Sequence, residues 1–105
     1  MTSMKDRENA FEAKFANDAE MQFKAEARRN RLLGLWAAEL LGKDGEDANA
    51  YAREVVKSDF SEPGDEDVFR KVKGDLGDRA TEEEIRTKMA ALMVTAKAQL
   101  VDEVE

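Results

Sequence analysis

The spacing of apolar residues differs sharply between the first 31 residues and the rest of the chain. Residues 1–31 contain no Leu, Ile, Val, Gly or Pro. In a helix, Met4, Phe11 and Phe15 would share an arc of about 40°, whereas a core helix needs an apolar arc of at least ~100°. The pattern therefore predicts that this leading segment forms a helical arm that binds a partner. The alternative is that Phe11 and Phe15 pack on the protein's own core.

A first long helix is expected to begin within the first few residues and to end at Leu41. Its last part, residues 32–41, contains five leucines, and Gly42 suits a left-handed cap after it. Gly34 lies inside this helix and weakens it by roughly 1 kcal/mol relative to alanine. Any bend or boundary of order is expected between Asp18 and Gly34.

Three further helices are predicted downstream. Apolar positions recur at helical spacing over residues 46–58, 65–76 and 81–104. Thr81 and Glu84 have the spacing of a capping box at the start of the last helix. The expected buried positions are Ala48, Tyr51, Ala52, Val55 and Val56 in the first of these helices, Val68, Phe69, Val72 and Leu76 in the second, and Ile85, Met89, Leu92, Ala96 and Leu100 in the third.

Residue type marks the connection between the second and third helices. Residues 61–64, Ser-Glu-Pro-Gly, predict a turn, Phe60 is expected to pack beneath the preceding helix, and Asp65 is the expected N-cap of the next helix. No useful stretch alternates apolar and polar residues with a period of two. The sequence thus predicts an all-α fold, a small four-helix bundle preceded by an amino-terminal helical arm.

Composition excludes several classes of protein. The 105 residues include no Cys and no His, which removes thiolate chemistry, the commonest general base and the commonest metal ligand. We therefore expect no catalytic residue, no metal and no cofactor, and a protein that is not an enzyme. No apolar run approaches the ~20 residues of a membrane span, so we expect a cytoplasmic protein that does not insert into a membrane.

The net charge of −7 is unevenly distributed, since residues 1–43 carry +1 and residues 44–105 carry −8. An acidic body disfavours nucleic acid as a partner. Arg28, Arg29 and Arg31 form a short basic cluster. We interpret this cluster as a solvated helix face with salt bridges to the acidic body.

Several short runs are more specific than a generic helical bundle requires. They are EAKFA at 12–16, FKAEARRN at 23–30, LLG at 32–34, WAA at 36–38, SDF at 58–60 and EPGDEDVFRK at 62–71. These runs resemble the zeta subunit of bacterial F-type ATP synthases, a family of alphaproteobacteria, and the similarity extends over nearly the whole chain.

The resemblance implies an inhibitor of the F-type ATPase. In the family, a four-helix body carries a mobile arm that becomes helical as it enters a catalytic interface between alpha and beta subunits, near the rotor, and blocks hydrolysis. The implied partners are the alpha, beta and gamma subunits of the synthase, which would hold the protein at the cytoplasmic face of the inner membrane. The free protein is expected to be a monomer.

Carried onto this sequence, the resemblance implies a mobile inhibitory arm of residues 1–18 and a four-helix globular body of residues 19–105. The inhibitory segment is about Thr2 to Asp18, with Phe11 and Phe15 as anchors and Lys14 as the charged element that sets the register. The candidate partner-binding residues are Arg7, Glu8, Phe11, Glu12, Lys14, Phe15 and Asp18.

An alternative function is a small regulatory module that binds a nucleotide or another small ligand in the bundle. In this hypothesis Lys24, Arg28 and Arg29 would meet phosphate groups near Trp36.

Overall fold

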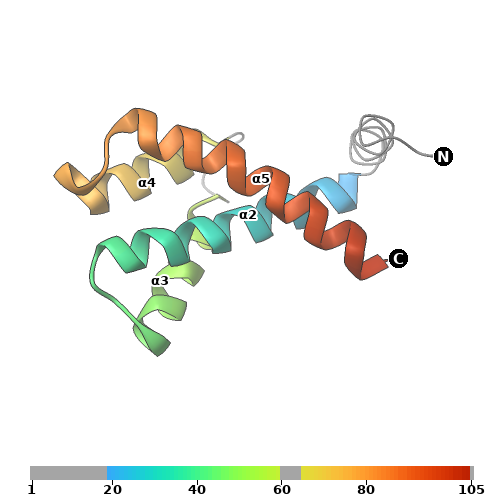
Figure 1. Cartoon of the computed structure of the whole chain (residues 1–105), viewed down its shortest axis with the longest axis horizontal. Helices are drawn as coiled ribbons and strands as arrows, with labels where there is room; N and C mark the ends of the chain where they lie inside the picture. Colours follow the sequence, from blue (N-terminus) through green and yellow to red (C-terminus); the bar gives the residue numbers. More distant parts are fainter. Residues whose placement is uncertain (1–18, 60–64, 105) are drawn as a thin grey trace.

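The computed structural model describes residues 19–59 and 65–104. These residues form α2 (Ala19–Leu40), α3 (Gly45–Ser58), α4 (Glu66–Leu76), the short 3₁₀ helix η1 (Gly77–Arg79) and α5 (Glu82–Val104) (Figure 1). No strand occurs in this part of the chain, so the predicted all-α, four-helix fold is confirmed. The predicted arm, residues 1–18, and the predicted packing and turn of residues 60–64 lie outside the described residues.

The other three α-helices all contact α2. α5 runs antiparallel to α2, and α3 and α4 lie toward the C-terminal end of α2 (Figure 1). The first turns of α2 and the last turns of α5 continue beyond α3 and α4. The molecule therefore narrows from a four-helix end to a two-helix end.

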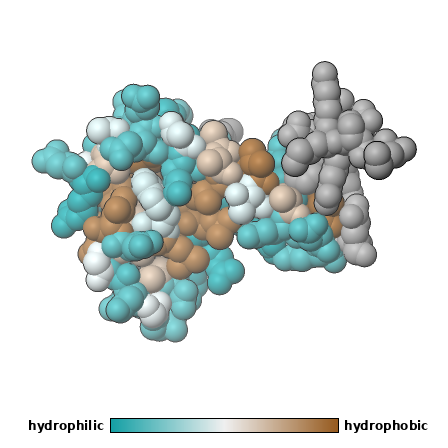
Figure 2. Space-filling model, in the orientation of Figure 1, coloured by the Kyte–Doolittle hydropathy of each residue, from teal (hydrophilic) through white to brown (hydrophobic). Residues whose placement is uncertain are grey.

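Two clusters of buried side chains follow this division. The larger cluster takes residues from all four α-helices and includes Leu33, Val55, Val72 and Ile85. The smaller cluster joins only α2 and α5 and consists of Met21, Ala25, Leu100 and Val101. On the face seen in Figure 2, apolar side chains are visible between hydrophilic ones over the four-helix end.

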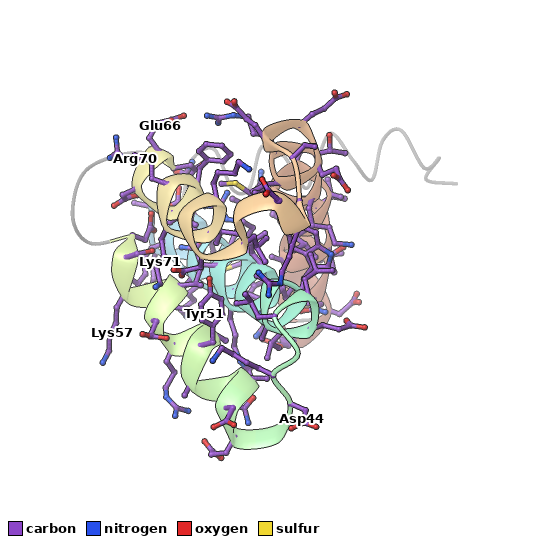
Figure 3. The ribbon with its side chains drawn as sticks, turned by 90° about the vertical axis from the view of Figure 1, so that its left-hand side faces the viewer. Asp44, Tyr51, Lys57, Glu66, Arg70 and Lys71 are labelled. Carbon is purple, nitrogen blue, oxygen red and sulfur yellow. The ribbon has the colours of Figure 1, made fainter. Side chains whose placement is uncertain are left out.

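Most of the predicted core positions are buried. Ala48, Val56 and Leu92 are the exceptions, because they are only partly buried. Tyr51 is buried as expected and lies beside Lys71 of α4, whose Nζ is 5.2 Å from the ring centroid (Figure 3). Helical periodicity therefore identified the inward faces of α3, α4 and α5 correctly.

The end of α2 has the predicted left-handed cap. Gly42 has a φ of 76°, which an L side chain adopts only with strain. The N–H of Lys43 donates to the carbonyl of Ala38 at 2.8 Å, and the N–H of Gly42 donates to the carbonyl of Glu39 at 3.1 Å. These two bonds form a Schellman motif, which satisfies carbonyl groups left over at the helix end.

The predicted capping box at the start of α5 is also present. The Thr81 N–H donates to Glu84 Oε1 at 3.0 Å, and the Glu84 N–H donates to Thr81 Oγ1 at 3.1 Å. Each side chain thus satisfies a backbone donor that the first turn leaves open.

Asp65 occupies the predicted N-cap position of α4, but its side chain makes no capping hydrogen bond. The carboxylate instead binds Arg29 of α2. The expected capping role of the side chain was therefore wrong, because a tertiary charged partner competes with the backbone N–H groups of the helix.

Gly34 does not interrupt α2, which runs as one helix from Ala19 to Leu40. The reason for glycine is packing, since a β-carbon at this position would lie 2.6 Å from the Ala52 α-carbon and 3.3 Å from the Val55 β-carbon. Gly34 thus allows α2 and α3 to approach each other closely.

Candidate functional site

The predicted partner-binding residues all lie in residues 1–18 and therefore outside the described residues. They are Arg7, Glu8, Phe11, Glu12, Lys14, Phe15 and Asp18. Their roles stay predictions. The first described helix, α2, begins at Ala19, directly after the arm, and carries the basic cluster of the sequence in its middle.

Arg29 is the buried member of that cluster, with 2% of its surface exposed. Its Nη2 lies 2.7 Å from Asp65 Oδ1 and its Nη1 lies 3.3 Å from Asp65 Oδ2, while its Nε donates to Asn30 Oδ1 at 2.7 Å. The predicted salt bridge to the acidic body is confirmed for this residue. The predicted solvated position is wrong, because α4 supplies a carboxylate that lets the guanidinium be buried.

This pairing explains how a charge can lie inside so small a protein. A buried charge is costly unless it is paired and its remaining donors are satisfied. The bidentate contact meets that condition with good geometry. It also joins the middle of α2 to the first residue before α4, across 36 positions of the chain.

Several carboxylates gather near this pair. Burial raises the pKa of Glu26, and the carboxylates of Asp59 and Asp65 raise it further, against the influence of Arg29. Burial likewise raises the pKa of Asp59, and Asp67 adds to the effect. The buried Asn30 amide nitrogen makes no hydrogen bond of standard geometry. The Asn30 side chain nevertheless favours the charged form of Asp59 and so lowers the pKa of that carboxyl, against the effect of burial. Negative charge is therefore in excess around Arg29.

Arg28, on the neighbouring position, joins α2 to α5. Its Nη1 lies 2.5 Å from Glu103 Oε1 and 3.5 Å from Gln99 Oε1. The salt bridge lies at the two-helix end of the molecule, so Arg28 and Arg29 tie α2 to two different helices.

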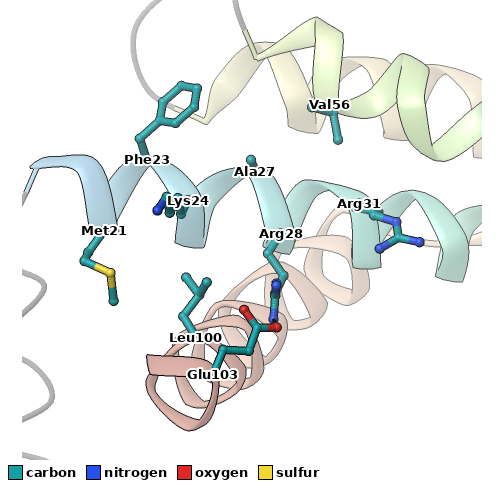
Figure 4. A pocket seen from close by; sticks show the side chains of 9 residues that line it. All are labelled: Met21, Phe23, Lys24, Ala27, Arg28, Arg31, Val56, Leu100 and Glu103. Carbon is teal, nitrogen blue, oxygen red and sulfur yellow. Dashed lines mark ion pairs between the residues drawn. The ribbon is translucent and has the colours of Figure 1, made fainter. Parts of the chain in front are cut away.

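A groove of about 660 Å³ lies along this side of α2. We call it the basic groove. Its apolar lining residues are Met21, Phe23, Ala27, Val56 and Leu100, and its charged lining residues are Lys24, Arg28, Arg31 and Glu103. In Figure 4, Val56 projects from α3 toward α2, and Arg28 and Glu103 face each other across α2 and α5.

The residues proposed to meet a nucleotide do not all line the basic groove. Lys24 and Arg28 line the basic groove, but Arg29 does not, because it is held by Asp65. Trp36 does not line the groove either; its ring lies 5.7 Å from Lys88 Nζ, measured to the centroid. Nucleotide binding itself stays a prediction.

Sequence reasoning missed Arg31 as a groove residue and missed the contribution of α3. The signal was present in part, since positions 24, 28 and 31 follow the i, i+4, i+7 spacing of one helix face. The position of α3 beside that face could not be read from spacing.

Within the described residues, no helix has the length and apolar character needed to cross a membrane.

Comparison with known proteins identifies the family. The model of the family described as ATPase inhibitor subunit zeta matches residues 1–99. A protein solved by solution NMR is 66% identical, with a TM-score of 0.74, over 79% of this chain and 98% of that one. No curated protein matches. The resemblance inferred from the short sequence runs is therefore confirmed, and the chain belongs to the ATPase inhibitor subunit zeta family.

Proposed function

We propose that this protein inhibits ATP hydrolysis by the F-type ATP synthase by inserting residues 1–18 as a helix at a catalytic interface between alpha and beta subunits, near gamma. The observation that carries the proposal is the family match, which spans residues 1–99 and so includes the arm together with the body. The synthase would then hold the protein at the cytoplasmic face of the membrane.

The amino-acid pattern of the arm supports this mode of action. Its narrow apolar edge offers few anchors, Phe11 and Phe15, flanked by charged residues such as Lys14. Helix-in-groove recognition uses such anchors at i and i+4 spacing, with charges that set the register. Ordering a free segment costs about 1–2 kcal/mol of backbone entropy per residue, so the anchors must contribute more than that cost.

The described body supports the proposal in a second way. Its two core clusters are built from α2, α3, α4, α5 and Ala80, so residues 19–104 supply a hydrophobic core that can hold the arm's point of attachment at Ala19.

The test compares the full chain with a chain lacking residues 1–18 in an ATP hydrolysis assay on the purified head of the cognate synthase. The full chain should inhibit and the shortened chain should not. Circular dichroism of both proteins checks that the helical body is intact. Equal inhibition by a correctly folded shortened chain would exclude the arm as the inhibitory segment.

A further inference from the structure

Five basic side chains line two adjoining grooves on one side of this acidic protein. Lys24, Arg28 and Arg31 of α2 line the basic groove, and Arg31, Arg53 and Lys57 line a second groove of about 390 Å³. The two grooves share the lining residues Arg31 and Val56, so they are adjacent. We call the five side chains the basic face.

We propose that the basic face is a second docking surface, which binds an amphipathic, carboxylate-bearing helix on the head of the synthase while the arm occupies the catalytic interface. This inference rests on the proposed function. It assigns a binding role to the body, in addition to the role of the arm.

The charge state of the basic face supports an acidic occupant. Within residues 19–59 and 65–104, Arg31 and Lys57 have no ion pair. A protein of net charge −7 has carboxylates in excess, yet in the described structure none reaches these two cations. An external carboxylate is therefore the complementary group, and the local positive potential would guide its approach.

The other three cations are paired, but through exposed partners. Lys24, Arg28 and Arg53 pair with Glu20, Glu103 and Glu46, whose side chains are 77%, 57% and 81% exposed respectively. Ion pairs with such exposed carboxylates contribute little to stability. Carboxylates of a partner can therefore replace them at small cost.

The spacing of the cations favours a helix over a small anion. Lys24, Arg28 and Arg31 extend over seven positions of α2, which is about 10 Å along the helix axis. A partner helix with acidic residues at every third or fourth position presents charge over the same length. A nucleotide concentrates its phosphate charge at one end, so it would engage only part of this row.

Apolar side chains between the cations give the surface a second kind of contact. Ala27, Val56 and Leu100 line the basic groove together with the charged side chains. An amphipathic helix could bury an apolar residue against them while its flanking carboxylates meet the arginines. Attachment through the body would raise the effective concentration of the arm at its own site.

The experiment uses the full chain with Arg31→Glu and Lys57→Glu, the two cations of the basic face without an ion pair in the described structure. The matched control carries Lys43→Glu and Arg79→Glu, which are exposed, line neither groove and change the charge equally. Binding to the purified synthase head is measured by biolayer interferometry at low and moderate salt, and inhibition of hydrolysis is measured separately.

The double variant at the basic face should bind about tenfold more weakly than the wild type, with a slower, less salt-dependent association. Its maximal inhibition at saturating concentration should be unchanged, because the arm is intact. The control should differ by less than about threefold. The inference would be overturned if the basic-face variant and the control variant bound the head with equal affinity. It would also be overturned if the wild-type chain did not bind the head.

Two further outcomes separate this inference from the proposed inhibitory function and from nucleotide binding. A wild-type chain that binds through the basic face but does not inhibit would refute the proposed function and leave the docking surface supported. Saturable binding of ATP or ADP, detected by calorimetry and lost in the basic-face variant while binding to the head is kept, would show that the face is an anion site and overturn the docking role.

Discussion

Gly34 of α2 and Ala52 of α3 lie in such close contact that a β-carbon on Gly34 would come within 2.6 Å of the Ala52 α-carbon and 3.2 Å of its β-carbon. The nearer atom belongs to backbone, so it cannot move aside as the end of a flexible side chain can. The contact sets how closely the two helices approach beside the larger core cluster.

Replacing Gly34 with alanine should therefore destabilise the protein. Alanine favours the helix by about 1 kcal/mol, but the forced separation of α2 and α3 should cost more, for a net loss of about 1–3 kcal/mol. Urea unfolding followed by circular dichroism measures the difference. Gly74→Ala in α4 is the matched control, because no atom lies within 4 Å of a β-carbon there, and it should stabilise by up to about 1 kcal/mol. A Gly34→Ala protein at least as stable as the wild type would show that the helices can separate without cost.

Replacing Asp65 with alanine should leave the buried Arg29 guanidinium without its bidentate partner. We expect a loss of about 1–3 kcal/mol in the free energy of unfolding, whereas Asp78→Ala, on the exposed η1 helix, should change it by less than about 0.5 kcal/mol. A double-mutant cycle with Arg29→Met isolates the pair from any effect on the start of α4. The interpretation fails if Asp65→Ala costs the same in both backgrounds.

Tyr51 allows a direct test of the contact between α3 and α4. Its hydroxyl donates to Asp75 Oδ2 at 2.8 Å, and burial, followed by this hydrogen bond, raises the pKa of Tyr51 well above its ordinary value. Folding thus favours the neutral phenol. The stability that this contributes is present below the unfolded value of about 10 and is lost as the pH rises toward the folded value.

The measurement is an ultraviolet titration, which is simple because the chain has one tyrosine. Tyrosinate should appear near pH ~10 in urea and only at higher pH, or on alkaline unfolding, in the native protein. Tyr51→Phe should remove the signal and cost about 1 kcal/mol of stability. Equal midpoints in the native and unfolded protein would contradict the buried hydrogen bond.

Replacing Phe11 and Phe15 together with alanine should weaken inhibition of ATP hydrolysis by at least about tenfold, since each ring is proposed to fill a pocket on the synthase. The melting temperature should change by less than about 2 °C, because the proposal gives these rings no part in the core. Asn9→Ala with Asn17→Ala, at arm positions outside the proposed contacts, provides the control. A large fall in melting temperature with inhibition retained would favour the alternative that the rings pack on the body.

Local sequence patterns were sufficient to predict the four helices and the inward faces of α3, α4 and α5. The capping box of Thr81 and Glu84 and the glycine cap at Gly42 involve residues within five positions of one another, and such contacts can be recognised from residue type. Periodicity likewise identified Val55, Val72 and Ile85 as core residues, because burial on one helix face repeats every three or four positions.

Contacts between distant segments were decided by the tertiary structure. Residue type suggested a solvated Arg29 and a capping Asp65, but the approach of α2 to α4 made each the partner of the other. By helix propensity alone, Gly34 destabilises its helix. The tertiary structure shows that glycine is needed at this position, because a β-carbon would clash with Ala52. The basic groove also depends on Val56 of α3 coming beside Arg31 of α2. The physical reason is the same in each case: helix formation depends on residues a few positions apart, whereas the burial of a charge or the closeness of two helices depends on the partner that folding brings to it.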